Sequence, residues 1–255
     1  MPKTIILMYH NIDIPPKGAK IPNLYVTPRM FSFQMWYLKF AGFKVLSLTD
    51  LLAVVAAGNR ADNLVAITFD DGYRDFYENA FPILKRYSYP STVYIVSGLA
   101  GNDNLWDSCN ENTRKPLMDW GMVGEVSRNG VEIGSHTKSH PQLSTLSGEA
   151  LREELQSSKK DLEERLGRKI EHFCYPYGDL NAAVKEEVAQ AGYRSAVTTR
   201  RGHVLDRSDP LLLPRIPIKL VTNPISFFYK IQTNAEMRKG KKQQDRNERS
   251  KGERR

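Results

Sequence analysis

Short hydrophobic runs alternate with segments of helical periodicity along most of the chain. The runs predict eight strands, at Thr4–Tyr9, Val45–Leu48, Leu64–Phe69, Thr92–Val96, Val131–Ser135, His172–Cys174, Tyr193–Thr198 and Leu211–Ile218. Most of the intervals between them predict helices; between Ser147 and Leu166, for example, leucines recur at helical spacing. Alternation of strands and helices at this spacing is typical of an α/β fold with a mostly parallel sheet or a barrel.

The chain is long enough to form such a fold without cross-links. Its 255 residues suit one large α/β domain, and its two cysteines, Cys109 and Cys174, argue against a disulfide framework. The first apolar run is too short for a signal peptide, and no run approaches the roughly 20 apolar residues that span a bilayer. The sequence therefore predicts a cytoplasmic protein with one globular domain over residues 1–222.

Residues 223–255 differ from the rest in composition. Asn223 and Pro224 predict the start of a last helix, whose apolar residues precede a basic stretch. From Arg238 to Arg255, nine Lys and Arg stand against three acids, so this stretch carries +6 of the net charge of +8. We expect a disordered, solvated tail. The alternative is peripheral contact with an anionic membrane, whereas specific nucleic-acid binding is disfavoured because no recognised module accompanies the charge.

The first candidate for chemistry is the segment Thr68-Phe69-Asp70-Asp71-Gly72, which closes an apolar strand. Two adjacent carboxylates at a strand end are costly to place together unless a cation or a proton shares the site. A tight turn accounts equally well for an Asp-Gly pair. This motif alone leaves both interpretations open.

His136 and His140 lie in the segment that follows another apolar strand. Pro141 biases His140 away from helical geometry, so we expect a loop that holds both imidazoles; two exposed loop histidines are the alternative. Two imidazoles and the carboxylate of Asp71 would form a facial set of metal ligands with open positions for water. Asp70 is then a candidate general base.

Three further motifs also follow predicted strands. Tyr175-Pro176-Tyr177-Gly178 is either a plain turn or a rigid loop that presents a backbone N–H at the edge of a site. His10 follows the first strand, and Arg215 lies near the end of the last. Each of these alone is more often structural. All five motifs nevertheless fall at carboxyl ends of strands, which face the same side of a parallel α/β fold, and this favours one shared site.

These motifs resemble those of a known family. The segments at 68–72, 136–140 and 175–178 resemble, in residues, order and separation, the leading motifs of polysaccharide deacetylases, carbohydrate esterase family 4. The resemblance runs from about His10 to Arg215. It implies a distorted (β/α) barrel in a single domain and a divalent metal, usually zinc, with cobalt, nickel or iron as alternatives. It also implies residue roles: the metal ligands Asp71, His136 and His140, the base Asp70, and an oxyanion-stabilising backbone N–H at Tyr177, next to Pro176.

The sequence departs from the common family pattern at two places. Cys174 stands where the third motif usually carries an arginine that orients the base, and no Leu-x-His motif near the C-terminus supplies the usual acid. Both gaps resemble the branch that includes poly-N-acetylglucosamine deacetylases, in which a Tyr-His near the N-terminus supplies the acid. This resemblance implies that His10 is the acid and that Arg215 orients Asp70. Trp106 is a candidate surface for stacking a sugar ring.

The favoured hypothesis is a metal-dependent hydrolase that removes N-acetyl groups from an amino sugar or glycan. An O-acetyl esterase or a small-molecule C–N amidohydrolase on the same fold is the first alternative. An inactive carbohydrate-binding module is disfavoured because no ligand or acid–base position is missing. Substrate choice is expected to depend on the loops over residues 11–25 and 98–118.

Overall fold

The computed structural model describes residues 3–58, 63–107 and 114–252. Its strands are β1 (Thr4–Tyr9), β2 (Lys44–Val45), β3 (Leu64–Phe69), β4 (Thr92–Ile95), β5 (Glu132–Ser135), β6 (His172–Cys174), β7 (Ser195–Arg201) and β8 (Leu213–Pro217). Its helices are α1 (Pro28–Phe40), α2 (Leu48–Ala56), α3 (Phe81–Tyr87), α4 (Trp120–Arg128), α5 (Gly148–Arg152), α6 (Ser158–Leu166), α7 (Ala182–Gln190), α8 (Pro224–Gln232) and α9 (Ala235–Gly252). Single π-helical turns precede α3 and join α5 to α6.

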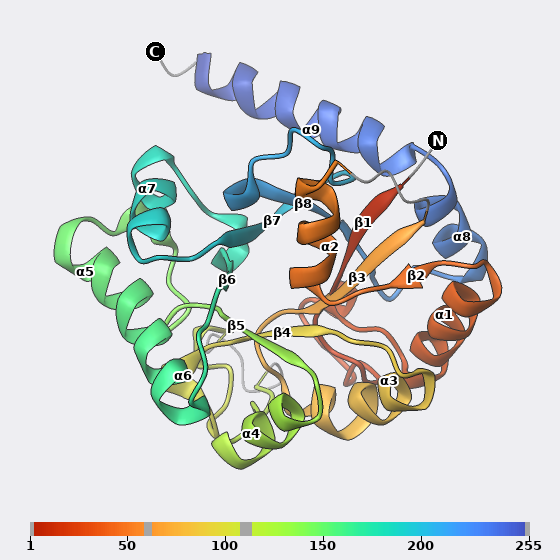
Figure 1. Ribbon diagram of the computed structural model, residues 1–255, viewed down its shortest axis with the longest axis horizontal. Coiled ribbons are helices and arrows are strands. Elements are labelled where there is room, and N and C mark those ends of the chain that lie inside the picture. Colours follow the sequence, from red (N-terminus) through yellow and green to blue (C-terminus); the bar gives the residue numbers. More distant parts are fainter. Residues whose placement is uncertain (1–2, 59–62, 108–113, 253–255) are drawn as a thin grey trace.

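Within these described ranges, seven parallel strands form a closed barrel. The strand order is β1-β8-β7-β6-β5-β4-β3, and β1 pairs with β3 along its whole length, which closes the ring. The short β2 pairs with the first two residues of β3. Figure 1 shows the barrel in the centre and helices around its circumference. The α/β barrel that the sequence predicts is therefore confirmed.

Alternate side chains of the strands pack into two different hydrophobic cores. On β3, Val65 packs into the core under the surrounding helices, whereas Ala66 belongs to a smaller core inside the barrel. Alternate residues face opposite sides of a strand. Asp70 therefore continues the inward series of Ala66 at the carboxyl end of β3, and His10 continues the inward series of Ile6 at the carboxyl end of β1.

α2 closes the amino end of the barrel. Leu48 and Leu51 of this helix are fully buried in the inner core, and Figure 1 shows α2 lying across the near end of the barrel. The sequence predicted a strand over Val45–Leu48, but β2 ends at Val45. The Ser47 side chain accepts a hydrogen bond from the Asp50 N–H and starts the helix there instead.

Over residues 238–252, the expectation of a disordered tail is corrected by α9. This helix packs against β7 and continues past the barrel at the top of Figure 1. Glu236 is fully buried and accepts a hydrogen bond from Arg201 Nη1 at 3.0 Å, while Met237 Sδ accepts one from His203 N. Charge composition does not predict this packing, because only one face of α9 packs against the barrel.

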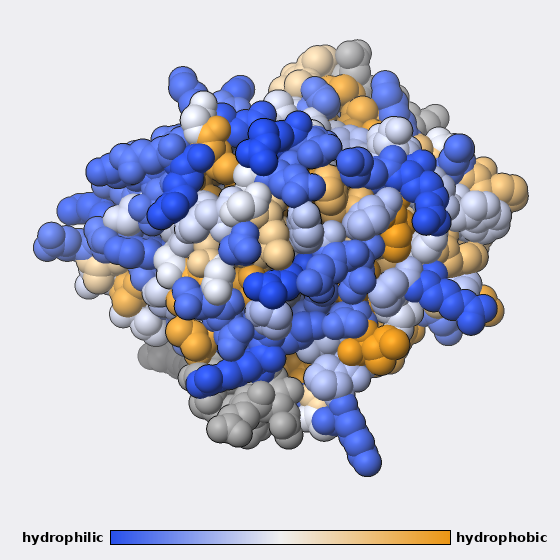
Figure 2. Space-filling view, turned by 90° about the horizontal axis from the view of Figure 1, so that it is seen from below, coloured by the Kyte–Doolittle hydropathy of each residue, from blue (hydrophilic) through white to orange (hydrophobic). Residues whose placement is uncertain are grey.

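One face of the molecule is mostly polar. Figure 2 shows that the face over α3 and α4 is largely hydrophilic, with hydrophobic residues scattered across it. Within the described ranges, none of the helices combines the length and apolar character that crossing a membrane requires.

Candidate active site

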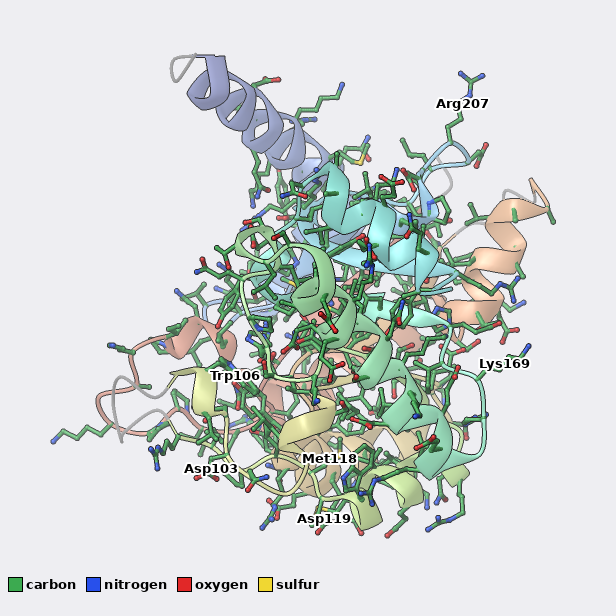
Figure 3. The ribbon with its side chains drawn as sticks, turned by 90° about the vertical axis from the view of Figure 1, so that its left-hand side faces the viewer. Asp103, Trp106, Met118, Asp119, Lys169 and Arg207 are labelled. Atoms are coloured by element: carbon green, nitrogen blue, oxygen red, sulfur yellow. The ribbon has the colours of Figure 1, made fainter. Side chains whose placement is uncertain are left out.

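A cleft of about 900 Å³ lies at the carboxyl end of the barrel. It is lined by seven of the nine residues that the sequence singles out: His10, Asp70, Asp71, Trp106, His136, His140 and Tyr177. The other two, Pro176 and Arg215, are buried beside it. Figure 3 shows Trp106 and Asp103 at this end of the molecule, with Lys169 and Arg207 at the opposite end.

Asp71 lies opposite both imidazoles. Its Oδ1 is 3.2 Å from His136 Nε2 and 3.4 Å from His140 Nε2, and all three side chains are buried. One ligand atom from each residue lies within 4.8 Å of the other two. His136 Nδ1 donates to the carbonyl oxygen of Cys174 at 2.7 Å, which leaves Nε2 as the atom available to a metal. One carboxylate and two imidazole nitrogens suit a divalent transition metal, so the donor set fits the expected cofactor.

The charge of Asp71 also suits a metal ligand. Burial alone would raise the pKa of this carboxyl, but hydrogen bonds from His136 and His140 hold the pKa well below its usual value. The side chain is therefore an anion at neutral pH.

Left-handed backbone conformations position the loops of the site. Four of the six described non-glycine residues with positive φ lie here: Asp71 (73°), Thr137 (66°), His140 (63°) and Tyr177 (59°). Each such residue costs on the order of 1–3 kcal/mol, and strain of this kind clusters at functional sites. Thr137 Oγ1 accepts a hydrogen bond from His140 N at 2.9 Å, which stabilises the turn between the two histidines. The two histidines therefore lie in a loop, as predicted.

Arg215 holds Asp70 through two parallel hydrogen bonds. Nη1 donates to Asp70 Oδ1 at 2.6 Å and Nη2 donates to Oδ2 at 2.7 Å, with both side chains buried. Burial would raise the pKa of Asp70, but the charge and hydrogen bonds of Arg215 hold that pKa below its usual value. Asp70 is thus an oriented anion at the floor of the cleft.

The surroundings of Arg215 account for its precise position. Nε donates to the Thr198 carbonyl oxygen at 3.0 Å, Nη1 also donates to Thr68 Oγ1 at 3.1 Å, and Nη2 lies 3.4 Å from Cys174 Sγ. The guanidinium enters from β8, so the small side chain of Cys174 leaves room for it. Arg215 therefore pairs with Asp70 from the space beside the small Cys174 side chain.

His10 lies on the cleft side of Asp70. Its Nε2 is 3.7 Å from Asp70 Oδ2, and 17% of its side chain is exposed. This distance is too long for a hydrogen bond. Both side chains nevertheless line the same cleft.

Two aromatic residues surround His140 at the rim of the cleft. The Trp106 ring stacks on the imidazole with centroids 4.3 Å apart, and the Tyr177 ring meets it edge-on at 4.6 Å. Trp106 is half-buried and Tyr177 is exposed. These rings form an aromatic border beside the Asp71, His136 and His140 side chains.

Several cleft residues were missed by sequence reasoning. Tyr73 and Thr199 line the cleft, as do four cations: Arg201, Lys219, Lys239 and Lys242. The two on α9 were assigned to a solvated tail. Gly240 was the residue in the sequence that could have indicated the packing of α9. A glycine inside a helix destabilises it, and is expected only where close packing requires it. A Cβ at this position would collide with the carbonyl oxygen of Arg201.

Comparison with known sequences points to one family. The sequence signature of the family described as polysaccharide deacetylase matches residues 57–196, more than half of the chain. A Bacillus subtilis protein, YxkH, which is named as a candidate polysaccharide deacetylase, is 28% identical over 201 residues. The poly-β-1,6-N-acetyl-D-glucosamine N-deacetylase of Staphylococcus aureus is 28% identical over 204 residues. The alignments cover 78% and 79% of this chain but only 66% and 70% of these two relatives.

Solved structures with a similar fold include a deacetylase. The Streptococcus pyogenes deacetylase PplD, determined in complex with acetate, has a TM-score of 0.79 and 28% identity, and the match covers 91% of this chain and 100% of PplD. IcaB from Ammonifex degensii has a TM-score of 0.74, with 91% and 97% coverage. At 23% identity, the IcaB match concerns the fold alone.

Proposed function

Because the chain belongs to the polysaccharide deacetylase family, we propose that it is a metal-dependent hydrolase that removes N-acetyl groups from an amino sugar or glycan. The observation that carries the proposal is the presence, in one cleft, of a buried Asp–His–His set and a second carboxylate, Asp70, held by Arg215. The S. aureus relative is named for an N-acetylated glycan, which supports the substrate class.

In this proposal Asp71, His136 and His140 hold the cation. Zinc suits the set best, and cobalt, nickel or iron are compatible with it. When bound, the cation supplies Lewis-acid polarisation of the acyl carbonyl and of water. Asp70 accepts a proton from the attacking water, and Arg215 is a positioning residue that keeps Asp70 ionised and oriented.

The remaining roles follow from positions around the cleft. His10, whose Nε2 lies 3.7 Å from Asp70 Oδ2, donates a proton to the leaving amine. The backbone N–H of Tyr177, in its left-handed turn after Pro176, donates a hydrogen bond to the developing oxyanion. Trp106 provides a ring on which a sugar can stack.

The variant Asp70→Asn tests the central assignment. We expect it to bind metal like the wild type, because the three ligands are unchanged, and to lose about 100-fold or more in kcat. Acetate release from N-acetylglucosamine oligomers and elemental analysis measure the two properties. Asp50→Asn makes the same chemical change on α2, at the other end of the barrel, and serves as the control. An Asp70→Asn enzyme with wild-type turnover would exclude Asp70 as the base.

Two alternative functions predict different outcomes. An O-acetyl esterase or a small-molecule amidohydrolase on this fold would prefer acetylated xylan or cyclic imides over N-acetylglucosamine oligomers in a parallel activity screen. An inactive carbohydrate-binding module would release no acetate and contain no tightly bound divalent metal.

Membrane contact is a further part of the proposal. Exposed apolar side chains on α1 and α8 support it: Trp36, Phe40, Ile225, Phe228 and Tyr229. The double variant Phe40→Ser/Ile225→Ser should reduce co-sedimentation with anionic liposomes if this surface enters the interface. A cytoplasmic location, peripheral to the membrane, likewise stays a prediction.

A further inference from the structure

One wall of the cleft is cationic. Arg201 at the end of β7, Lys219 after β8, and Lys239 and Lys242 of α9 all line it. Lys239 and Lys242 are three positions apart, which places them on the same face of the helix. The wall therefore brings together residues from three separate parts of the chain.

Specific packing holds α9 in this position. Gly240 lets the helix backbone lie directly against the backbone of Arg201, where any larger residue would collide with the carbonyl oxygen. Glu236, one turn earlier, is fully buried. A glycine inside a helix costs about 1 kcal/mol relative to alanine, so this close contact must compensate for it.

The cations exceed the acids available to neutralise them. Glu236 pairs with Arg201 at 3.0 Å and with Lys239 at 2.8 Å. Among the described residues, neither Lys219 nor Lys242 forms an ion pair with a carboxylate. Lys219 is half-buried and Lys242 is exposed. The two carboxylates that line the cleft already have partners. Asp70 pairs with Arg215, and Asp71 pairs with His136 and His140.

A neighbouring lysine lies beside the same buried acid. Lys230 is 3.9 Å from Glu236. Burial lowers the pKa of Lys230 to about 8; Glu236 opposes this lowering, and the charges of Arg201, Lys239 and Lys219 add to it.

We propose that Lys219 and Lys242 bind an anionic group, a phosphate or a carboxylate, that the glycan substrate carries beside its N-acetylated sugar. The proposal rests on the proposed deacetylase function and specifies its substrate class. Lysine ammonium groups bind phosphate and carboxylate as point charges. A cleft with one sign of excess charge also concentrates ligands of the opposite sign. A neutral oligomer would leave this wall without a partner.

The test compares neutral and charged substrates in matched pairs. A disaccharide of N-acetylglucosamine is assayed against its 1-phosphate, and a disaccharide of N-acetylglucosamine with glucose is assayed against one with glucuronic acid. For the metal-loaded wild type, kcat/KM for acetate release should be about tenfold higher for a charged substrate at low ionic strength, and the preference should shrink with added salt. If the phosphorylated substrate is preferred over its neutral counterpart, the anion is a phosphate; if the glucuronic acid substrate is preferred, it is a carboxylate.

Substitution of both lysines should remove this preference. In Lys219→Gln/Lys242→Gln, kcat/KM for the charged disaccharide should fall about tenfold, to the neutral value, while kcat/KM for the neutral disaccharide stays unchanged. Lys241→Gln, on the same helix but outside the cleft lining, should retain the wild-type preference. Equal kcat/KM for neutral and charged disaccharides in the wild type would overturn the proposal, as would equal losses on both substrates in the double variant.

A binding measurement separates this proposal from the proposed function. If none of the disaccharides releases acetate, the deacetylase proposal fails. Isothermal titration calorimetry with the 1-phosphate and the neutral disaccharide then tests anion binding by Lys219 and Lys242 independently of catalysis. Tighter binding of the 1-phosphate to the wild type than to Lys219→Gln/Lys242→Gln would support it, and equal binding would overturn it.

Discussion

Arg215→Met removes the guanidinium that pairs with Asp70 and leaves a side chain that still fills part of the space. Arg215 is 1% exposed and donates to Asp70 at 2.6 and 2.7 Å. The variant therefore leaves a buried carboxylate without its counter-ion. Removing one partner of a buried ion pair costs about 3–5 kcal/mol. We expect a loss of this size in the free energy of unfolding at pH 7, measured by urea denaturation.

The size of this loss should depend on pH. Burial opposes ionisation of Asp70, but Arg215 keeps the pKa of the folded protein below the usual value. The pair therefore stabilises the wild type fully above the unfolded-state pKa of about 4, and this contribution disappears as the pH falls through the folded-state pKa. In the variant, burial without the cation should raise the pKa of Asp70. The stability difference should then be largest near pH 7, shrink as the pH falls through the raised pKa of Asp70 in the variant, and shrink further below about pH 4.

A double-mutant cycle separates the ion pair from packing. The variant Arg215→Met/Asp70→Asn contains neither charge, so its loss should be smaller than the sum of the single losses by about 1–3 kcal/mol. Arg194→Met is the surface control: Arg194 lies 3.1 Å from Glu171 but is 73% exposed, so its loss should stay below about 1 kcal/mol. Additive losses that are equal at pH 7 and pH 4 would refute the reasoning.

Three other substitutions test neighbouring parts of the structure. His140→Ala removes one of the three proposed metal ligands and should lose bound metal on dialysis, as elemental analysis would detect; full retention would argue against this site. His10→Asn should lower kcat about 100- to 10,000-fold with bound metal unchanged, as measured by steady-state kinetics. Gly240→Ala should lower the midpoint of urea unfolding although alanine is the better helix former, because the new Cβ meets the Arg201 carbonyl. A higher midpoint would mean that α9 does not pack as described.

The alternation of apolar runs and helical segments determined the parallel α/β class, because strand and helix periodicity are local properties of the chain, and the family resemblance implied the barrel. The motif at 68–72 and the histidines at 136 and 140 were recognisable for the same reason: each lies within a few residues of the strand that positions it. Their convergence at one end of the barrel follows from parallel strands alone. The strand limits were less certain, as at Val45–Leu48, where the Ser47 cap starts a helix early.

The contacts between distant segments were decided only by the tertiary structure. Arg215 stands 145 positions after Asp70, and the family resemblance suggested their pairing without its two-bond geometry. The position of α9 was not foreseen at all, because composition counts its charges but cannot reveal that Gly240 packs on Arg201. That packing brings Lys239 and Lys242 into the cleft. The sequence by itself therefore determined the candidate chemistry, and the non-local packing of one helix decided which charges a substrate would meet there.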